Sequence, residues 1–427
     1  MEFSVIANLF EELEVKKKRL DKVDLLKNFL LNNPKESPII FDLICGNYQR
    51  KIEKRKIGIS LKTIFSSLST ISSKNELEIE KKFNEIGDIG GVAQEVITQK
   101  RGSNLVKRKL SLKQIIETLD KISNTSGKNS NKRKREMVSE LYYSISLPVE
   151  YKFLSRLLID DLRVGVSEGT LREVCCCALF ASIDGVEQTK KNLTKNIEKN
   201  EISIEEFIEL DNKDNLVVKN SRETYNELLS IFEKKYNILV SFEEIIEELR
   251  KDKNNLFKYE IKLGKPFKSM LGPRSTSITD AFEKTLKPAL LDFKYDGLRV
   301  QIHNNKGKVD LFTRNLDNIT KQFPEIVEYI KTNFSDLSFV LDSECVGYDF
   351  EKRKFIPFQV FSKRILTKEL RSVSHISVAV RTFDIVYLNG ETIFKKPYKE
   401  RREILESLFF NRKLVQKQKI LDFSNRQ

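Results

Sequence analysis

The sequence predicts a multidomain chain in which an all-α part is followed by a mixed α+β part. Three observations lead to this prediction. The length of 427 residues suits two or three domains of roughly 150 residues each. Apolar residues recur with a helical period through about the first 180 positions. Beyond Phe257 the period shortens to two, which indicates strands.

The first part reads as a series of amphipathic helices. Its opening residues show the pattern clearly, because one helix face collects Phe3, Ile6, Ala7, Phe10 and Leu13. Glycines and small hydroxyl residues interrupt the helices at three points, which are 87–91, 125–130 and 161–165. Each point is either a plain helix–helix turn or a helix start whose exposed N–H groups hold phosphate.

The stretch 190–255 is rich in Lys, Glu and Asn, and it is interpreted as surface helices and a variable linker rather than a site. We therefore place a helical domain at 1–255 and a second domain at 256–427.

The second domain carries the strand signals. Val300 and Ile302 alternate with polar neighbours, a turn follows at 304–307, and alternation resumes at Val309, which predicts a β-hairpin. Further strands are predicted at 339–346 and 382–388.

Composition excludes several classes of protein. No run approaches the roughly 20 apolar residues of a membrane span, and the first residues lack a signal-peptide pattern, so we expect a cytoplasmic protein. Five cysteines in no paired spacing indicate reduced thiols. With two histidines in the chain, a metal is expected to be a hard ion held by oxygens.

The net charge of +14 is unevenly distributed along the sequence. The segment from Lys100 to Arg135 contains twelve Lys and Arg residues but two acidic residues, Glu117 and Asp120. Such a field suits a phosphate backbone, although solvated surface charge would give the same pattern.

The segment Lys-Tyr-Asp-Gly-Leu-Arg at 294–299 has the residue types of a covalent nucleotidyl-transfer site. On an extended chain Lys294 and Asp296 point to the same side, and Gly297 lets the backbone turn without a Cβ clash. To attack phosphorus the lysine amine must lose its proton, which nearby positive charge favours. Arg299, Arg314 and a metal ion could supply the positive charge.

Three further residues add to this chemistry. Asp342 and Glu344 lie two apart on one predicted strand face and could hold Mg²⁺ or ribose hydroxyls, or could simply face solvent. Phe383 could stack on a base, or could be a core residue of its strand.

Taken in order, these pieces resemble the ATP-dependent DNA ligases of the archaeal and eukaryotic type. Residues 294–299 match the family's motif I, and 312–315, 341–344 and 383–385 resemble motifs Ia, III and IIIa. Residues 264–271 resemble the start of the adenylation domain, and the three glycine-containing points resemble the family's DNA-binding domain. The resemblance covers nearly the whole chain apart from about 190–255.

The resemblance implies an all-α DNA-binding domain followed by an α+β nucleotidyltransferase domain that adenylates itself with ATP and Mg²⁺ and then seals nicked double-stranded DNA. Lys294 would be the nucleophile. Asp292 would lie near adenine, Arg299 and Arg314 would contact ribose and phosphates, Glu344 would bind ribose or metal, and Phe383 would stack on adenine. The implied DNA contacts are Gly87, Asp88, Gly90, Ser126, Gly127, Lys128, Ser130, Arg163 and Gly165.

The sequence departs from the family pattern in four ways. The family's second glycine-containing loop in the helical part has no clear counterpart near 237–242. Asp292 replaces a longer glutamate, and the segment 99–105 lacks the aromatic pair of a clamp-binding motif, so docking to a sliding clamp is not supported. Motifs IV and V and the C-terminal OB domain are not found. We therefore expect a truncated ligase, or one half of a split enzyme whose partner chain supplies the missing motifs, that adenylates Lys294 poorly alone.

Two other functions fit some of these residues. A capping-type guanylyltransferase or an RNA ligase shares motif I, although the large helical part with its basic stretch argues against both. A non-catalytic remnant would bind nicked duplex without forming an AMP adduct.

Overall fold

A computed structural model describes residues 1–46, 59–72, 74–98, 109–125, 127, 129–179, 208–210, 216–218, 222–270, 272, 274–285, 290–366, 376–410 and 421–423. Its contacts divide the chain into two compact units, residues 1–233 with 241–257, and residues 234–240 with 258–427. Among the described residues, no helix is both long enough and apolar enough to cross a membrane.

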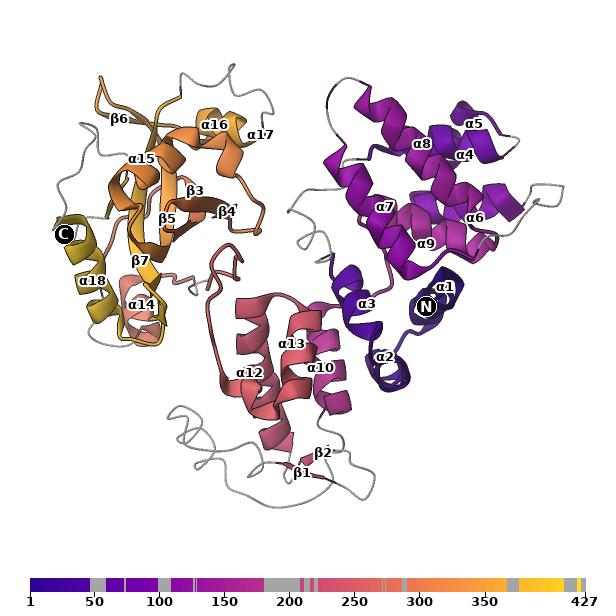
Figure 1. Ribbon diagram of the computed structural model, residues 1–427, viewed down its shortest axis with the longest axis horizontal. Coiled ribbons are helices and arrows are strands. Elements are labelled where there is room, and N and C mark those ends of the chain that lie inside the picture. The colour runs from indigo at the N-terminus through magenta and orange to yellow at the C-terminus, as the bar shows by residue number, and fades with distance from the viewer. Residues whose placement is uncertain are drawn as a thin grey trace. The chain divides into compact units, whose positions relative to one another are not determined.

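The first unit is built mainly from helices, as predicted (Figure 1). Their bounds are α1 Phe3–Val15, α2 Arg19–Asn32, α3 Ser37–Ile44, α4 Leu61–Ile71, α5 Glu76–Ile86, α6 Ile89–Thr98, α7 Leu112–Asn124, α8 Ser130–Tyr143, α9 Pro148–Leu158, α10 Glu168–Leu179, α12 Arg222–Leu239 and α13 Phe242–Lys251, followed by the 3-10 turn η3 Lys253–Phe257. The last residues of α12, from Lys234 onward, are counted with the second unit. A short antiparallel pair, β1 Ile208–Leu210 and β2 Leu216–Val218, completes the first unit.

The predicted apolar face of α1 is confirmed. Phe3, Ile6, Ala7, Phe10 and Leu13 are all buried. The ring of Phe10 meets the ring of Phe153 from α9 edge-on, with centroids 5.4 Å apart. Helical periodicity therefore located the core side of this helix correctly.

The structure differs from the linker expected within 190–255. The apolar side of α13 is fully buried, and the helix packs against α3. The carboxylate of Asp42 accepts hydrogen bonds from the Ser241 hydroxyl at 2.9 Å and from the Phe242 N–H at 2.8 Å, which fixes the start of α13 to α3. The many charged residues of this helix lie on its outer side and hide a strongly amphipathic pattern.

The second unit contains the antiparallel sheet that the alternating pattern predicts. Its central order is β4-β3-β5-β7-β8, with β6 added to β5 and β9 parallel to β7. The strand bounds are β3 Leu298–Asn305, β4 Lys308–Thr313, β5 Ser338–Asp349, β6 Lys354–Ile356, β7 Val378–Leu388, β8 Glu391–Thr392 and β9 Leu421–Phe423. The accompanying helices are α14 Ile278–Lys284, α15 Pro324–Phe334, α16 Phe358–Phe361, α17 Lys363–Leu366 and α18 Tyr398–Phe410, with a 3-10 turn, η4, at Thr320–Gln322.

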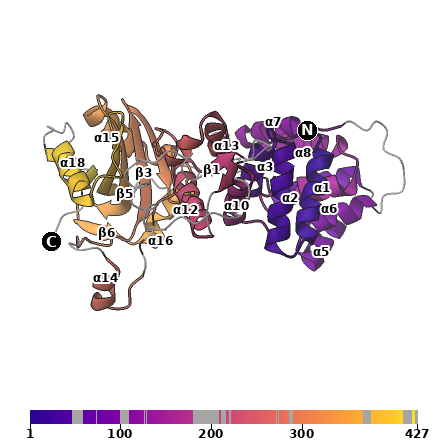
Figure 2. The ribbon, with the colours of Figure 1, turned by 90° about the horizontal axis from the view of Figure 1, so that it is seen from below.

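The two faces of this sheet are covered differently. Helices α15 and α18 lie along one face (Figure 2), where their apolar residues join Val300, Leu341 and Cys345 in the main core. On the other face, the segment that includes Ile261 and Phe267 packs on Val340 and Val386. Because side chains alternate along a strand, Arg299, Asp342 and Glu344 point to this second face.

Two β-bulges interrupt the pairing of β5 with β7. In one of them Asp342 pairs with Asp384 and Ser343 pairs with Thr382, so that Phe383 has no partner residue in β5. A bulge bends the strand and re-aims the side chain of the extra residue.

Candidate active site

A cavity of about 640 Å³ in the second unit gathers the predicted nucleotide-binding residues. Its lining contains Asp292, Phe293, Lys294, Tyr295, Gly297, Leu298, Arg299, Arg314, Glu344, Phe383 and Tyr398. The six residues expected at this site from the sequence are therefore brought together from three strands and their connections. What each of them does remains a prediction.

Gly297 lets the motif approach β5 closely. A Cβ placed on Gly297 would lie 2.4 Å from the Cys345 carbonyl oxygen and 2.7 Å from a Val346 methyl carbon, closer than any side chain tolerates. Its N–H group also donates to the Glu344 carboxylate. The glycine therefore sets the separation between the Lys294 segment and Glu344.

Arg299 is held in a fixed orientation by Asp342. Its Nε and Nη2 donate to the two carboxylate oxygens of Asp342 at 3.0 and 2.7 Å, and its Nη1 donates to the Met270 carbonyl at 3.0 Å. Such a two-point ion pair is rigid and specific. The expectation that Asp342 and Glu344 act together as free carboxylates is thus modified, because Asp342 is buried and engaged by Arg299.

Glu344 has the electrostatics of a functional carboxyl group. Burial raises its pKa to about 7, although the charges of Lys294 and Arg299 and the Gly297 hydrogen bond act in the opposite direction. A perturbed carboxyl group in a cavity is a functional candidate. At neutral pH this side chain can either keep or release a proton.

Phe383 projects into the cavity as a result of the bulge in β7. The guanidinium carbon of Arg299 lies 5.5 Å from the centre of its ring, within the range of a cation–π contact. The ring is half-buried and lines the cavity wall, which suits stacking on a flat ligand.

Asp292 and Arg314 complete the predicted set, and both side chains are exposed at the cavity. Arg314 directly follows β4, while Asp292 lies two residues before Lys294. Together with Lys294 and Arg299, Arg314 gives the cavity three cationic side chains, the charge that a polyphosphate requires.

Tyr398 is a lining residue that sequence reasoning missed. It is the first residue of α18, and its hydroxyl donates to the Phe383 carbonyl at 2.8 Å. No motif pointed to it, because it reaches the cavity from a helix that follows the last recognised strand segment.

The residues present fit a Mg²⁺-nucleotide but not a metal held by protein groups alone. Within the described part of the chain, no cluster of three or more His, Cys, Asp or Glu side chains could hold a metal. Mg²⁺ commonly uses one or two carboxylates and takes its other ligands from water and substrate phosphates. Glu344 is the carboxylate suited to this role.

In the helical unit, the structure brings two of the three predicted DNA-binding segments together. The side chain of Arg163 donates a hydrogen bond to the Gly87 carbonyl at 2.9 Å. The side chain of Arg156 donates to the Asp88 carboxylate at 2.7 Å and to the Leu162 carbonyl at 3.3 Å, and so bridges the two segments. Burial alone would raise the pKa of Asp88, but the hydrogen bonds and charge of Arg156 outweigh it and lower this pKa. Asp88 also caps α6 by accepting from the N–H groups of Gly90 and Gly91.

The remaining predicted DNA contacts are distributed as follows. Gly90 is buried, and a Cβ there would lie 2.7 Å from the Arg156 Nε, so the glycine lets α6 pack closely on α9, and its contact with DNA stays a prediction. Gly165 has a positive φ of 63° and holds the Lys22 amine through its carbonyl at 2.9 Å. Gly127 and Ser130 form the turn before α8, while Ser126 and Lys128 lie outside the described residues.

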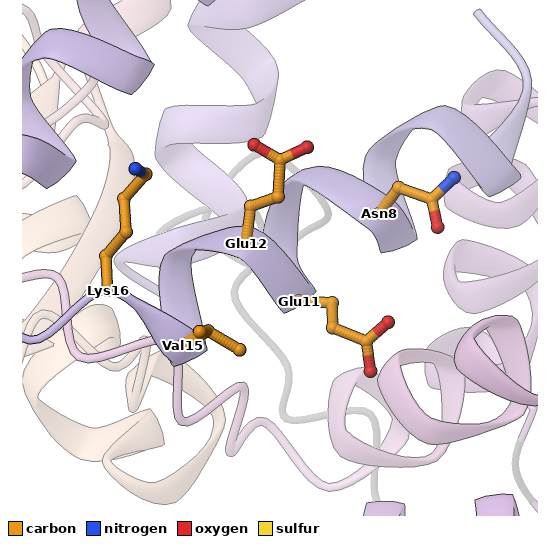
Figure 3. Close-up of a pocket in the computed structure, with 5 residues that line it drawn as sticks. All are labelled: Asn8, Glu11, Glu12, Val15 and Lys16. Carbon is orange, nitrogen blue, oxygen red and sulfur yellow. The ribbon is translucent and has the colours of Figure 1, made fainter.

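A second hollow, of about 440 Å³, lies along α1 in the helical unit (Figure 3). The described residues that line it are Asn8, Glu11, Glu12, Val15 and Lys16. Two carboxylates beside a single amine do not suit a polyphosphate ligand. This hollow is therefore not a candidate for the nucleotide site.

Two segments of the chain match known protein families. Residues 2–176 match the DNA ligase N terminus, and residues 269–427 match the ATP dependent DNA ligase domain. The chain is 29% identical over 411 residues to the DNA ligase of Nanoarchaeum equitans and 31% identical over 415 residues to that of Thermoplasma volcanium. Each alignment covers 96% of this chain, but only 64% and 62% of the respective relative.

Among solved structures, the chain resembles the ligase domain of LigD from M. tuberculosis. The sequence identity is 23% and the TM-score is 0.25, with 31% of this chain and 40% of that chain covered. A likeness this low adds no support for a shared arrangement.

The two family matches occur in the same order as the helical part and the α+β part of the chain. The chain therefore belongs to the family of ATP-dependent DNA ligases, whose members use ATP, with Mg²⁺ as the usual metal.

Proposed function

We propose that this protein is an ATP-dependent DNA ligase that seals nicks in double-stranded DNA. The observation that supports this proposal most strongly is the single cavity that contains Lys294, Arg299, Arg314, Glu344 and Phe383. A primary amine, two guanidinium groups, a carboxyl group and an aromatic ring match the needs of a nucleoside triphosphate.

In the first step, the Lys294 amine attacks the α-phosphorus of ATP. A P–N bond forms, the bond to the bridging oxygen breaks, and pyrophosphate leaves, while the lysine proton passes to solvent. Arg299 and Arg314 neutralise charge on the phosphates, and Phe383 stacks on adenine. Phosphoryl transfer depends on positioning and charge neutralisation more than on acid–base chemistry.

In the second and third steps, the adenylate moves to DNA. An oxygen of the 5′-phosphate attacks the phosphorus of AMP and the P–N bond breaks, while the lysine nitrogen takes up a proton from solvent and leaves as the amine. The 3′-hydroxyl then attacks the 5′-phosphate, forms the phosphodiester bond and displaces AMP, with its proton passing to solvent. Each step exchanges one bond to phosphorus for another, so no oxidant or reductant is required.

A bound Mg²⁺ ion would neutralise charge on the phosphates during transfer. Glu344 would hold it in its ionised form. Because Gly297 donates a hydrogen bond to the Glu344 carboxylate, the same glycine that positions the Lys294 segment also orients this ligand.

The helical unit would bind the duplex through its sugar–phosphate backbone. The exposed residues Lys132, Arg133 and Arg135 lie on α8. Contacts to phosphate fix the position of a protein on DNA without reading base sequence, which suits an enzyme that must act at any nick.

The proposal is tested by incubating the protein with ATP and Mg²⁺ and measuring its intact mass. We expect an AMP adduct that peptide mapping assigns to Lys294, that Lys294→Arg abolishes, and that ATP produces more readily than GTP. Sealing of a labelled nicked duplex is then measured with the same preparation. Binding of nicked duplex without any AMP adduct would instead favour a non-catalytic role.

A further inference from the structure

The first turn of α18 holds the part of β7 that carries Phe383. The Tyr398 hydroxyl donates to the Phe383 carbonyl at 2.8 Å, and Arg402 Nη1 donates to the same oxygen at 3.3 Å. At the next residue, Asp384 receives two hydrogen bonds from Arg401, at 2.8 and 3.0 Å. Helix and bulge are therefore joined at two consecutive residues.

The bulge explains why these contacts are needed. Phe383 has no partner residue in β5, so the regular ladder does not fix its backbone on that side. A carbonyl group in a half-buried position needs a hydrogen-bond donor from elsewhere. Tyr398 supplies the shorter of the two hydrogen bonds to this carbonyl.

The Tyr398 side chain is itself fixed and stays neutral. The guanidinium carbon of Arg401 lies 5.2 Å from the centre of its ring. Burial raises the pKa of Tyr398, and the charges of Asp384 and Asp292 act in the same direction although Arg402 opposes them. The hydroxyl therefore remains a donor throughout the neutral pH range.

Tyr398 also lines the same cavity as Phe383, the residue expected to stack on a base. Its ring lines the cavity together with Phe383 and Asp292. The cationic residues expected to contact phosphates, Arg299 and Arg314, belong to β3 and to the residue after β4. A flat ligand stacked on Phe383 would thus have Tyr398 as a neighbouring wall.

We propose that Tyr398 is a positioning residue for the nucleotide base, holding the Phe383 ring as a stacking surface through its hydrogen bond to the Phe383 carbonyl. This inference rests on the proposed nucleotide site. It predicts that loss of the hydroxyl weakens the binding of ligands that contain a base and leaves the binding of a bare polyphosphate unchanged.

The test compares the dissociation constants of ATP and of inorganic tripolyphosphate by calorimetry, using the full chain. Tyr398→Phe removes only the hydroxyl group, and Phe383→Leu removes the stacking ring as a reference. Tyr387→Phe is the matched control, because Tyr387 lies on the same strand but packs against the small core of Ile261, Val340 and Val386 and is not among the described residues that line the cavity. Thermal unfolding confirms that each variant is folded.

For Tyr398→Phe we expect ATP binding to weaken about fivefold, the effect of one lost hydrogen bond, with no change for tripolyphosphate or in the Tyr387→Phe control. If Phe383→Leu weakens ATP binding but Tyr398→Phe does not, the inference is overturned and the nucleotide site stands. An equal loss of ATP and tripolyphosphate binding in Tyr398→Phe would show a general structural role and would also overturn it. If the wild-type chain binds no ATP, both proposals fail.

Discussion

At the scale of single residues, the site depends on how burial and charge act on Glu344. Burial raises its pKa to about 7, against the influence of Lys294, Arg299 and the Gly297 N–H group. The folded chain therefore holds this proton up to a higher pH than the unfolded chain does. The stability that comes from the neutral carboxyl group is present at low pH and is lost as the pH rises from about 4.5 towards 7.

Glu344→Gln is therefore expected to stabilise the protein at pH 8, where the wild-type carboxyl group is ionised. After discounting for partial exposure, the gain is about 1 kcal/mol, or roughly 2–4 °C in the unfolding midpoint. At pH 4 the two proteins should unfold at nearly the same temperature. Thermal unfolding followed by circular dichroism at both pH values tests this, and a lower midpoint for the variant at pH 8 would contradict it.

The sequence predicted which residues would share the site but not how they would pair. Alternation along a strand placed Asp342 and Glu344 on one face, and this is correct. It gave no sign that Arg299 would reach diagonally to Asp342 and leave Glu344 with the cavity. Pairing across a sheet depends on register, which the spacing within one segment does not encode.

At the scale of elements, the approach of the motif to β5 is the critical contact. Gly297→Ala would place a Cβ 2.4 Å from the Cys345 carbonyl oxygen, so the backbone must shift. We expect a loss of about 1–3 kcal/mol in stability and a fall in Lys294 adenylation of roughly 100-fold, because small displacements are costly in a reacting site. The measurements are the unfolding midpoint and the initial rate of AMP incorporation.

Gly272→Ala is the matched control in the same unit, because no atom lies within 4 Å of the Cβ that it would add and its φ is not positive. It should leave both quantities unchanged. If Gly297→Ala behaved in the same way, the close approach would have no functional importance.

In the helical unit, a glycine again allows two elements to approach closely, and here the elements are α6 and α9. A Cβ at Gly90 would lie 2.8 Å from the Lys152 carbonyl oxygen and 2.7 Å from Nε of Arg156, whose side chain links Asp88 to Glu14. Gly90→Ala should therefore cost about 1–3 kcal/mol and weaken binding of nicked duplex. Gly169→Ala, on α10 with no contact closer than 3.7 Å, should be neutral or stabilising. Unfolding and duplex-binding measurements on both variants separate the two outcomes.

The helices and strands were predicted correctly where apolar residues recur with one regular period. They were not predicted in detail where a bulge interrupts that period. The hairpin of β3 and β4 follows from uninterrupted alternation and a turn with two adjacent asparagines. The bulge at Phe383 has no such signal, although it decides that this phenylalanine lines the cavity instead of entering the core. Tyr398 was missed for a related reason, since its hydrogen bond to the Phe383 carbonyl depends on the bulged strand.

At the scale of the whole molecule, the positive charge should govern binding to DNA. The chain carries a net charge of +14. Replacing the exposed Lys132 with Gln should lower the slope of log affinity against log salt by about 0.9 if that side chain contacts one phosphate. Lys35→Gln, which removes an exposed lysine from the turn before α3, should leave the slope unchanged. Titrations of nicked duplex over a range of salt concentrations test this, and equal slopes for all three proteins would remove α8 from the DNA interface.

The central claim is that Lys294 becomes covalently bonded to AMP. The most direct measurement is intact mass spectrometry after incubation with ATP and Mg²⁺, followed by peptide mapping. We predict an AMP adduct that is located on Lys294 and is absent from Lys294→Arg. An adduct on a different residue, or ligation of nicked DNA by the Lys294→Arg variant, would contradict the claim.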